Sequence, residues 1–216
     1  MQGGAYNTGF LPCEGRKARF PAGFRTLSYP YYEVMAILKI AKMGHPVLQQ
    51  PAQPIKDPTN SKIRRLVQDM AETLVDAQGA GLAAPQVHEP LRLVMFLVPG
   101  HRAENSEAIP LTILINPTIT PLSDAMSEDW EACLSVPELT GLVPRWTSIR
   151  YSGLGLDGEP IERIADGFHA RVVQHECDHL DGILYPKRMT DLSMLMFSEE
   201  RRHYMKAAED GAEEIE

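Results

Sequence analysis

The stretch Val172-Val173-Gln174-His175-Glu176-Cys177-Asp178-His179-Leu180 decides how the rest of the chain is arranged. It contains the pattern His-Glu-x-x-His. Residues four apart lie on one face of a helix, so His175 and His179 can bind one metal ion together. Glu176 is rotated by about 100° from His175, which is close enough to act on a water molecule held by that ion. The stretch therefore predicts a metal-binding helix.

The flanks of this stretch extend the predicted helix. Asp166 is a suitable N-cap and Gly182 a suitable stop. Apolar and metal-ligating side chains form two adjacent stripes: Phe168, Val172, His175, His179 and Ile183 in one, and His169, Val173, Glu176 and Leu180 in the other. Such coverage is typical of a buried, central helix. Two helical histidines can also be ordinary polar core residues, but chance gives this pattern in well under roughly one in a hundred chains of this length.

Composition limits the class of protein. The chain has 216 residues, 44% of them hydrophobic and 23% charged, which is normal for a globular domain. The net charge of −8 argues against a broad nucleic-acid-binding surface, so we expect no direct DNA binding. No apolar run approaches the length of a membrane span, and we expect no membrane contact. Three cysteines, Cys13, Cys133 and Cys177, give no disulfide framework and favour a reducing compartment.

The chain divides into three parts by sequence. Residues 1–34 are basic, rich in Gly, Pro and Tyr, and without a clear period, so we expect a peripheral N-terminal extension. It is either an organelle transit peptide or a non-native start, and Met35-Ala-Ile-Leu-Lys-Ile reads like a natural protein start. Residues 35–190 form the expected catalytic domain. Residues 191–216 are expected to hold a C-terminal helix and an acidic tail.

Periodicity gives the remaining elements. A helix capped by Thr59 or Asn60 is expected to end at Gly79. Strands are expected at residues 91–98, 111–120 and 147–154, with a turn at 121–129. Thr190 or Asp191 is expected to cap the last helix. The fold class is therefore predicted as α+β, with short antiparallel strands packed around a central metal-binding helix.

The third metal ligand decides the chemistry, because catalytic sites usually take three protein ligands and leave one position for water. A metzincin pattern would need a third His where this chain has Tyr185. Glu199 or Glu200 could serve as in gluzincins, although both lie in a charged run that is typical of a solvated face. Cys133, within Glu-Ala-Cys-Leu-Ser, is the remaining candidate.

Three segments together resemble the peptide deformylases. They are GAGLAAPQ at 79–86, EACLS at 131–135 and QHECDH at 174–179, in the order found in that family, and Val143-Pro144-Arg145 also matches. The resemblance covers residues 36–190. One departure is Ala132, where the family usually has Gly, which would matter if the backbone there needed a positive φ or if a methyl group narrowed the cleft.

The resemblance implies a metallohydrolase that removes the formyl group from N-formylmethionyl peptides and releases formate. It implies that Cys133, His175 and His179 hold the metal ion and that Glu176 moves the proton. The side chain of Gln86 and the backbone N–H of Leu134 are the expected donors to the oxyanion.

Other residues have expected supporting roles. Phe168 and Val172 are expected to line a pocket for the methionine side chain, and Gly79 and Gly81 to pair with the substrate backbone. A charge network that fixes the ligands is a hypothesis for Glu131, Arg145 and Asp178.

The resemblance also implies Fe²⁺ as the native ion, with Zn²⁺, Ni²⁺ or Co²⁺ as substitutes, whereas affinity order alone favours Zn²⁺ over Fe²⁺. The expected partners are formylmethionyl nascent peptides, with transient ribosome contact; the oligomeric state is left open. The expected location is the bacterial cytoplasm, or an organelle if residues 1–34 are a transit peptide. Two alternatives stay open: a zinc endopeptidase that uses Glu199 or Glu200, and a non-catalytic metal- or peptide-binding domain.

Overall fold

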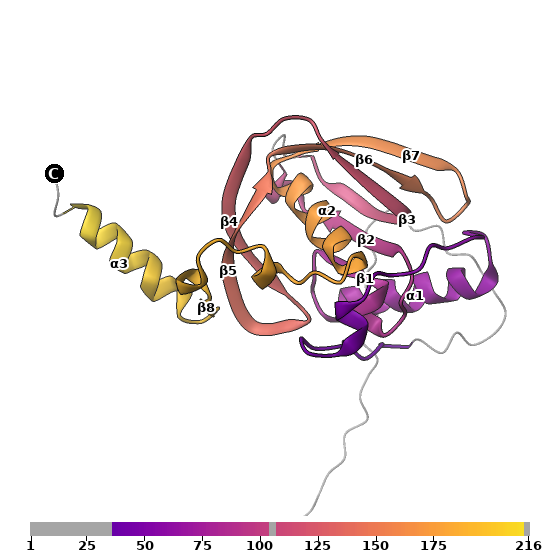
Figure 1. The fold of residues 1–216 in the computed structure, drawn as a ribbon, viewed down its shortest axis with the longest axis horizontal. Coiled ribbons are helices and arrows are strands. Elements are labelled where there is room, and N and C mark those ends of the chain that lie inside the picture. Colours follow the sequence, from indigo (N-terminus) through magenta and orange to yellow (C-terminus); the bar gives the residue numbers. More distant parts are fainter. Residues whose placement is uncertain (1–35, 104–106, 214–216) are drawn as a thin grey trace, which may run out of the picture. The chain divides into compact units, whose positions relative to one another are not determined.

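Two antiparallel sheets, with helices packed on them, form the core of the fold, and the C-terminal helix projects away from it (Figure 1). The structure is a computed structural model and describes residues 36–103 and 107–213. One sheet has the strand order β1-β2-β3-β6-β7 and the other β4-β5-β8. The strands are β1 Gly81–Ala83, β2 Leu93–Val98, β3 Ile109–Pro121, β4 Met126–Cys133, β5 Val136–Trp146, β6 Ser148–Leu154, β7 Pro160–Asp166 and β8 Met196–Phe197. The helices are α1 Ser61–Asp76, α2 Gly167–Leu180 and α3 Arg201–Glu213, with short 3-10 turns η1 Pro46–Gln49, η2 Ala84–Val87, η3 Gly100–Arg102, η4 Tyr185–Lys187 and η5 Leu192–Met194.

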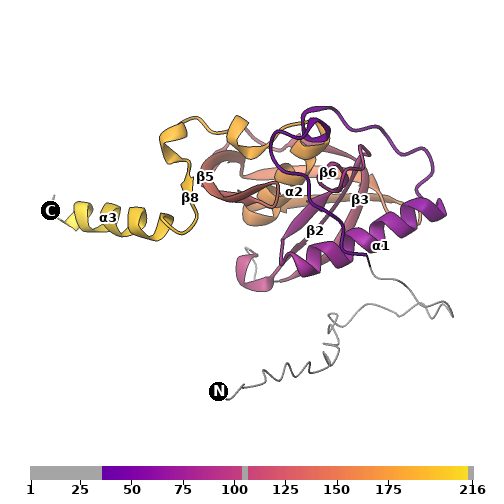
Figure 2. The ribbon, with the colours of Figure 1, turned by 90° about the horizontal axis from the view of Figure 1, so that it is seen from below.

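Strand β2 shows how the five-stranded sheet is buried on both faces. Its side chains alternate, so Val94 and Phe96 pack in the core on the α2 side while Leu93 and Met95 pack on the α1 side. All four are fully buried, and each contributes about 1.5–3 kcal/mol relative to exposure. Figure 2 shows the sheet between these helices. This core fixes the position of α2.

Helix α2 contacts strands of both sheets, and the predicted α+β class with antiparallel strands is confirmed. It begins after Asp166, whose side chain makes no capping hydrogen bond. It ends at Leu180 with Asp181 as C-cap, the next residue Gly182 adopts φ +71°, and the N–H of Ile183 donates to the carbonyl of Asp178 at 2.9 Å. This is a Schellman termination, for which glycine is preferred. At α1, Asn60 is the N-cap and accepts from the N–H of Lys62 at 2.9 Å.

The hairpin of β4 and β5 was missed by the sequence prediction, which placed a turn at residues 121–129. Strand β4 begins at Met126 and pairs with β5 from Met126↔Trp146 to Cys133↔Val136, with a register shift between Ala132 and Cys133. The first four residues of β4 are all exposed, so no apolar alternation marks it as a strand. The pairing of β4 with β5 makes it a strand, and that pairing leaves no periodic pattern in the sequence of β4.

The C-terminal helix also begins later than predicted. Asp191 caps only the 3-10 turn η5, through a hydrogen bond from the N–H of Ser193. Residues 196 and 197 then form β8 and pair with Thr140 and Leu139 of β5, so they are unavailable to a helix. Helix α3 starts at Arg201.

The described residues all belong to one compact unit. The predicted extension at 1–34 lies outside the described residues. Within the described part of the chain, no helix is long and apolar enough to cross a membrane.

Gly182→Ala should destabilise the protein more than Gly158→Ala. Both glycines have positive φ, +71° and +85°, so each substitution should cost about 1 kcal/mol in backbone strain. A Cβ on Gly182 would also lie 2.7 Å from Gln49 C and 2.8 Å from Gln50 N, whereas the nearest atom to one on Gly158 is Thr59 Cγ2 at 3.7 Å. We expect about 1–3 kcal/mol more loss at Gly182, measured by urea unfolding. Equal losses of unfolding free energy in the two variants would show that the close packing of Gly182 against Gln49 and Gln50 does not contribute to stability.

Candidate metal centre and active site

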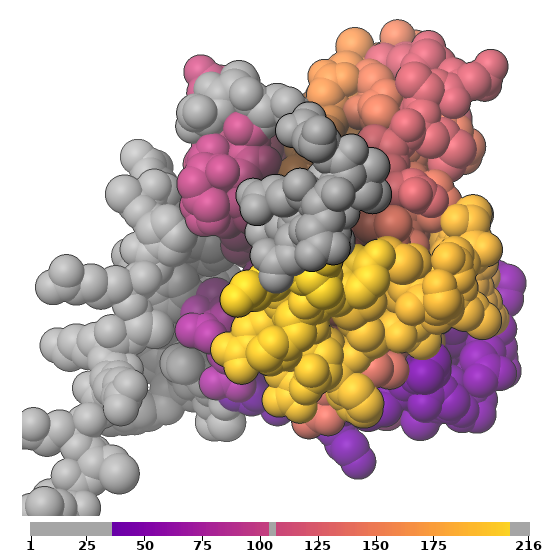
Figure 3. Space-filling view, turned by 90° about the vertical axis from the view of Figure 1, so that its left-hand side faces the viewer, coloured from indigo at the N-terminus to yellow at the C-terminus, as the bar shows by residue number. Residues whose placement is uncertain are grey.

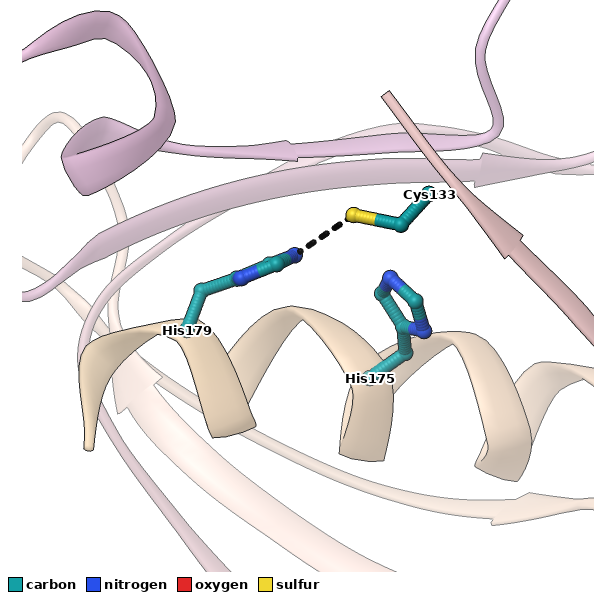
Figure 4. A group of neighbouring side chains, drawn as sticks. All are labelled: Cys133, His175 and His179. Carbon is teal, nitrogen blue, oxygen red and sulfur yellow. Dashed lines mark hydrogen bonds between the residues drawn. The ribbon is translucent and has the colours of Figure 1, made fainter. Parts of the chain in front are cut away.

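Three potential metal ligands converge from two elements. His175 and His179 lie one turn apart on α2, and Cys133 is the last residue of β4 (Figure 4). The sulfur of Cys133 lies 3.4 Å from Nε2 of His179. The ligand atoms of all three residues lie within 4.8 Å of one another. This is the one such group of three among the residues that the structure describes, and neither Glu199 nor Glu200 belongs to it.

The geometry of this group fits a divalent ion. Metal–sulfur and metal–nitrogen bonds of about 2.3 and 2.0–2.1 Å at a tetrahedral angle place the two ligand atoms about 3.6 Å apart. The observed separation of Cys133 Sγ and His179 Nε2, 3.4 Å, is close to that length. Burial alone would raise the pKa of the Cys133 thiol, but the neighbouring imidazoles of His179 and His175 outweigh it and lower that pKa well below its usual value. The sulfur is therefore in an environment that favours the thiolate a metal requires.

A buried carboxylate orients the first histidine. Glu131 Oε2 lies 2.8 Å from Nδ1 of His175, so Nδ1 is the donor and Nε2 is left for the metal. Arg145 donates to both oxygens of Glu131 at 2.9 Å, and Arg171 donates to Oε1 at 2.9 Å. Burial raises the pKa of Glu131, but the hydrogen bonds from Arg145 and His175 outweigh this and hold the pKa well below its usual range. These contacts therefore favour the anionic form of Glu131.

The network continues beyond Arg145. Its second terminal nitrogen donates to Asp178, and Arg188 binds the same carboxylate through Nη2 at 2.7 Å and Nε at 3.1 Å. The three residues that we expected to form a charge network, Glu131, Arg145 and Asp178, thus lie in one connected chain of ion pairs that ends on His175.

Glu176 faces the cleft from α2 and is almost completely buried. Burial raises its pKa to about 7, so it can hold or release a proton near neutral pH. Its Oε2 has no hydrogen-bond partner among the described residues. Gly81 lies against this carboxylate: a Cβ on Gly81 would be 2.5 Å from Cδ of Glu176. Only glycine at position 81 leaves room for the Glu176 carboxylate in this position.

Gln86 presents its amide nitrogen to the metal group. The N–H of Ala83 donates to Oε1 at 2.8 Å, which fixes the orientation of the amide. Nε2 then lies 3.2 Å from Ser135 Oγ and 3.5 Å from Cys133 Sγ. The following residue, Leu134, lines the same cleft, and its carbonyl accepts from Lys42 Nζ at 3.1 Å.

A cleft of about 620 Å³ opens over these groups. Ten of the thirteen site residues predicted from the sequence line this cleft. These ten are Gly79, Gly81, Gln86, Glu131, Cys133, Leu134, Phe168, Val172, His175 and Glu176. The other three, His179, Arg145 and Asp178, lie behind this surface and are buried. The sequence-predicted residues therefore gather at one place.

Comparison with known proteins gives the family. Residues 37–194 match the polypeptide deformylase family. The chain belongs to that family. It is 51% identical over 157 residues to peptide deformylase 1 of Nitrosomonas europaea, covering 72% of this chain and 89% of that one. It is 53% identical over 161 residues to peptide deformylase 1 of Bordetella pertussis, covering 74% and 92%.

Solved structures of deformylases have the same fold. A class I type b peptide deformylase from Acinetobacter baumannii with Met-Ala-Ser bound aligns with a TM-score of 0.67 at 34% identity, over 72% of this chain and 99% of that one. The enzyme from Ehrlichia chaffeensis aligns with a TM-score of 0.67 at 30% identity, over 74% and 91%. This chain is a metal-dependent hydrolase that removes the N-formyl group from newly made proteins, and the endopeptidase alternative is not favoured.

Three residues that contact the predicted site residues were missed from the sequence. Arg171 precedes His175 by one helical turn and Asp178 by two, so the helical spacing alone could have revealed it. Arg188 and Ser135 lie outside regular helices and strands, where spacing carries no such signal. The departure at Ala132 does not strain the backbone, because Ala132 does not have a positive φ. The described non-glycine residues that do are Gln78, His88, Asn116 and Glu138.

Gly81→Ala should remove most deformylase activity while metal content stays unchanged. The added methyl group must displace the Glu176 carboxylate, which we expect to carry the proton, and losing such a positioned group costs on the order of 10²–10⁴-fold in rate. Formate release and metal analysis on the same preparation measure this, with Gly158→Ala as the control. Full activity in Gly81→Ala would show that the position of Glu176 does not limit the reaction.

Arg145→Ala should weaken metal binding by about 10–100-fold, because it removes the cation that holds Glu131 against His175. Competition with a chelator, well below the melting temperature of the variant, measures the affinity. Arg150→Ala is the matched control, since Arg150 is half exposed and its nearest carboxylate oxygen, on Glu162, is 3.9 Å away. Equal affinities in the two variants would contradict a ligand-orienting role for Arg145.

Proposed function

We propose that the deformylation site consists of Cys133, His175 and His179 as metal ligands and Glu176 as the proton carrier. The observation that supports this assignment is the convergence of one sulfur and two imidazoles within 4.8 Å beside the buried Glu176 carboxylate. A divalent ion held there would polarise the formyl oxygen and make a water molecule acidic enough to attack near neutral pH. The protein itself supplies binding, orientation and proton transfer.

Glu176 accepts the proton of the attacking water as the new C–O bond forms at the formyl carbon. It then delivers that proton to the peptide nitrogen as the C–N bond breaks, so formate leaves and a free amine remains. A pKa near 7 suits both steps, because the group must gain and lose a proton in one cycle. The burial that raises the pKa of Glu176 also lowers the local dielectric constant, which strengthens the interaction of its carboxylate with the developing ammonium of the leaving amine.

Gln86 and Leu134 stabilise the oxyanion of the tetrahedral intermediate. The amide of Gln86 is already turned with its N–H₂ toward Cys133, and the backbone N–H of Leu134 is the second donor we assign. Losing one such donor costs about 3–4 kcal/mol in the activation barrier. Phe168 and Val172 bind the methionine side chain, and the backbone of Gly79 and Gly81 pairs with the peptide, since all four line the cleft.

We further propose Fe²⁺ as the native ion, with Zn²⁺, Ni²⁺ or Co²⁺ able to replace it. One thiolate and two imidazoles accept all four ions. Metal analysis after purification with and without oxygen tests this. We expect iron to be retained only in the preparation made without oxygen. Zinc in both preparations would instead indicate a native zinc enzyme.

The remaining assignments are also proposals. The enzyme acts in the bacterial cytoplasm on chains emerging from the ribosome, with transient ribosome contact. Residues 1–34 are peripheral to the catalytic domain at 35–190, so removing them should leave formate release unchanged. The C-terminal part, 191–216, carries Ser198 and Arg201, which line the cleft.

Cys133→Ala should lose the metal, whereas Glu199→Ala and Glu200→Ala should retain it. The two glutamates are exposed and lie outside the ligand group, so they serve as controls for each other. Wild-type protein should release formate from formyl-Met-Ala without cleaving internal peptide bonds. Metal loss in a glutamate variant, together with internal cleavage, would support the endopeptidase instead; retained metal without any turnover would support a binding domain.

A further inference from the structure

Two arginines from distant parts of the chain border the substrate cleft. Arg102 comes from η3 and Arg201 from the first turn of α3, and both line the cavity that contains Cys133 and Glu176. Figure 3 looks onto the molecule from the side of α3, the yellow helix. These two guanidinium groups bring positive charge to the cleft, although the whole chain carries a net charge of −8.

Each arginine lies over an aromatic ring. The guanidinium carbon of Arg102 is 3.7 Å from the centroid of Phe168, and that of Arg201 is 4.9 Å from the centroid of Trp130. Such stacking holds the flat face of the guanidinium and leaves its N–H edge directed outward. Both side chains are therefore positioned before any ligand arrives.

Neither arginine has a carboxylate partner among the described residues, in contrast to Arg145, Arg171 and Arg188. Nε of Arg201 is buried and has no hydrogen-bond acceptor in the described part of the chain. The cleft also holds the exposed Lys42, whose Nζ donates to the carbonyl of Leu134, and one exposed carboxylate, Glu138. An unpaired, preoriented guanidinium is suited to a carboxylate from outside.

The spacing indicates which substrate residue would reach these arginines. Trp130 lies three strand residues before Cys133, and Phe168 lies seven helical residues before His175, so each ring is about 10 Å along its element from a metal ligand. An extended peptide advances about 3.3 Å per residue, so about 10 Å corresponds to its third residue. Alternate side chains share one side, so the side chain of residue 3 lies on the same side as that of the methionine, which Phe168 is proposed to bind. Arg102 is stacked on that Phe168 ring and is therefore the group we assign to residue 3 on this side.

We propose that Arg102 and Arg201 form a specificity element that recognises an acidic side chain at the third residue of the formylated peptide. This inference rests on the proposed function only for the placement of the methionine. The arginines lie far from the bond that breaks, so they contribute to binding and should change KM rather than kcat.

The test compares formyl-Met-Ala-Glu-amide with formyl-Met-Ala-Gln-amide, which have no terminal carboxylate. For the wild-type enzyme we expect a kcat/KM about three- to tenfold higher with Glu, through a lower KM, and a smaller difference in 0.5 M salt. The double variant Arg102→Gln, Arg201→Gln should bring the ratio to about one and keep activity on the Gln peptide. Glu138→Gln, which removes the exposed carboxylate that also lines the cleft, should raise the ratio.

Arg202→Gln is the matched control, because Arg202 adjoins Arg201 but does not line the cleft, and its ratio should equal that of wild type. A wild-type ratio near one, or a ratio that survives in the double variant, would overturn the proposal. An enzyme that releases no formate from either peptide would refute the proposed chemistry alone. In that case calorimetry would compare the affinities of Met-Ala-Glu-amide and Met-Ala-Gln-amide. Tighter binding of the Glu peptide by wild type, lost in the double variant, would support the specificity element. Equal affinities in wild type, or a difference that survives in the double variant, would overturn it.

Discussion

The hydrogen bond between Glu131 and His175 is the interaction on which the active site depends. It joins β4 to α2, and because Nδ1 is engaged, it directs the other ring nitrogen toward Cys133 and His179. A buried carboxylate is stable only when it is paired, and here Arg145 and Arg171 pair with it. Removing one partner of such a pair leaves an unpaired buried charge, which typically costs about 3–5 kcal/mol. Metal binding and folding stability are therefore coupled through one carboxylate.

Helix α2 meets two demands that constrain its sequence. One side packs into the core of the five-stranded sheet through Ala170, Val173 and Leu180. Its other side carries the histidines and Glu176, which must be held firmly although they are polar. The close approach of β1 at Gly81 satisfies both demands, because the glycine lets the backbone of the sheet come near while the carboxylate keeps its place. The glycine at position 81 is thus explained by the helix beside it.

The sequence reveals what lies within one element and conceals what lies between elements. The spacing of His175 and His179 and the period of α1 are local, and both helices were found. Strand β4 has an exposed first half, so its pairing with β5 could not be read from alternation. Met196 is apolar and at helical spacing, yet it pairs with Thr140 in a sheet. Cys133 remained as a candidate third ligand beside the alternatives, and the family resemblance implied that role for it, because no periodicity links it to a helix some forty residues later.

Ala132 shows why one departure from the family pattern does not by itself imply lost chemistry. A glycine is required where φ is positive or where a Cβ has no room, and Ala132 is not among the described residues with positive φ. Its side chain is exposed, while those of Glu131 and Cys133 on either side are buried. The register shift of β4 falls between Ala132 and Cys133, and such an irregularity changes the direction of the next side chain. The direction of the sulfur therefore depends on the pairing of two strands rather than on the absence of a methyl group at position 132.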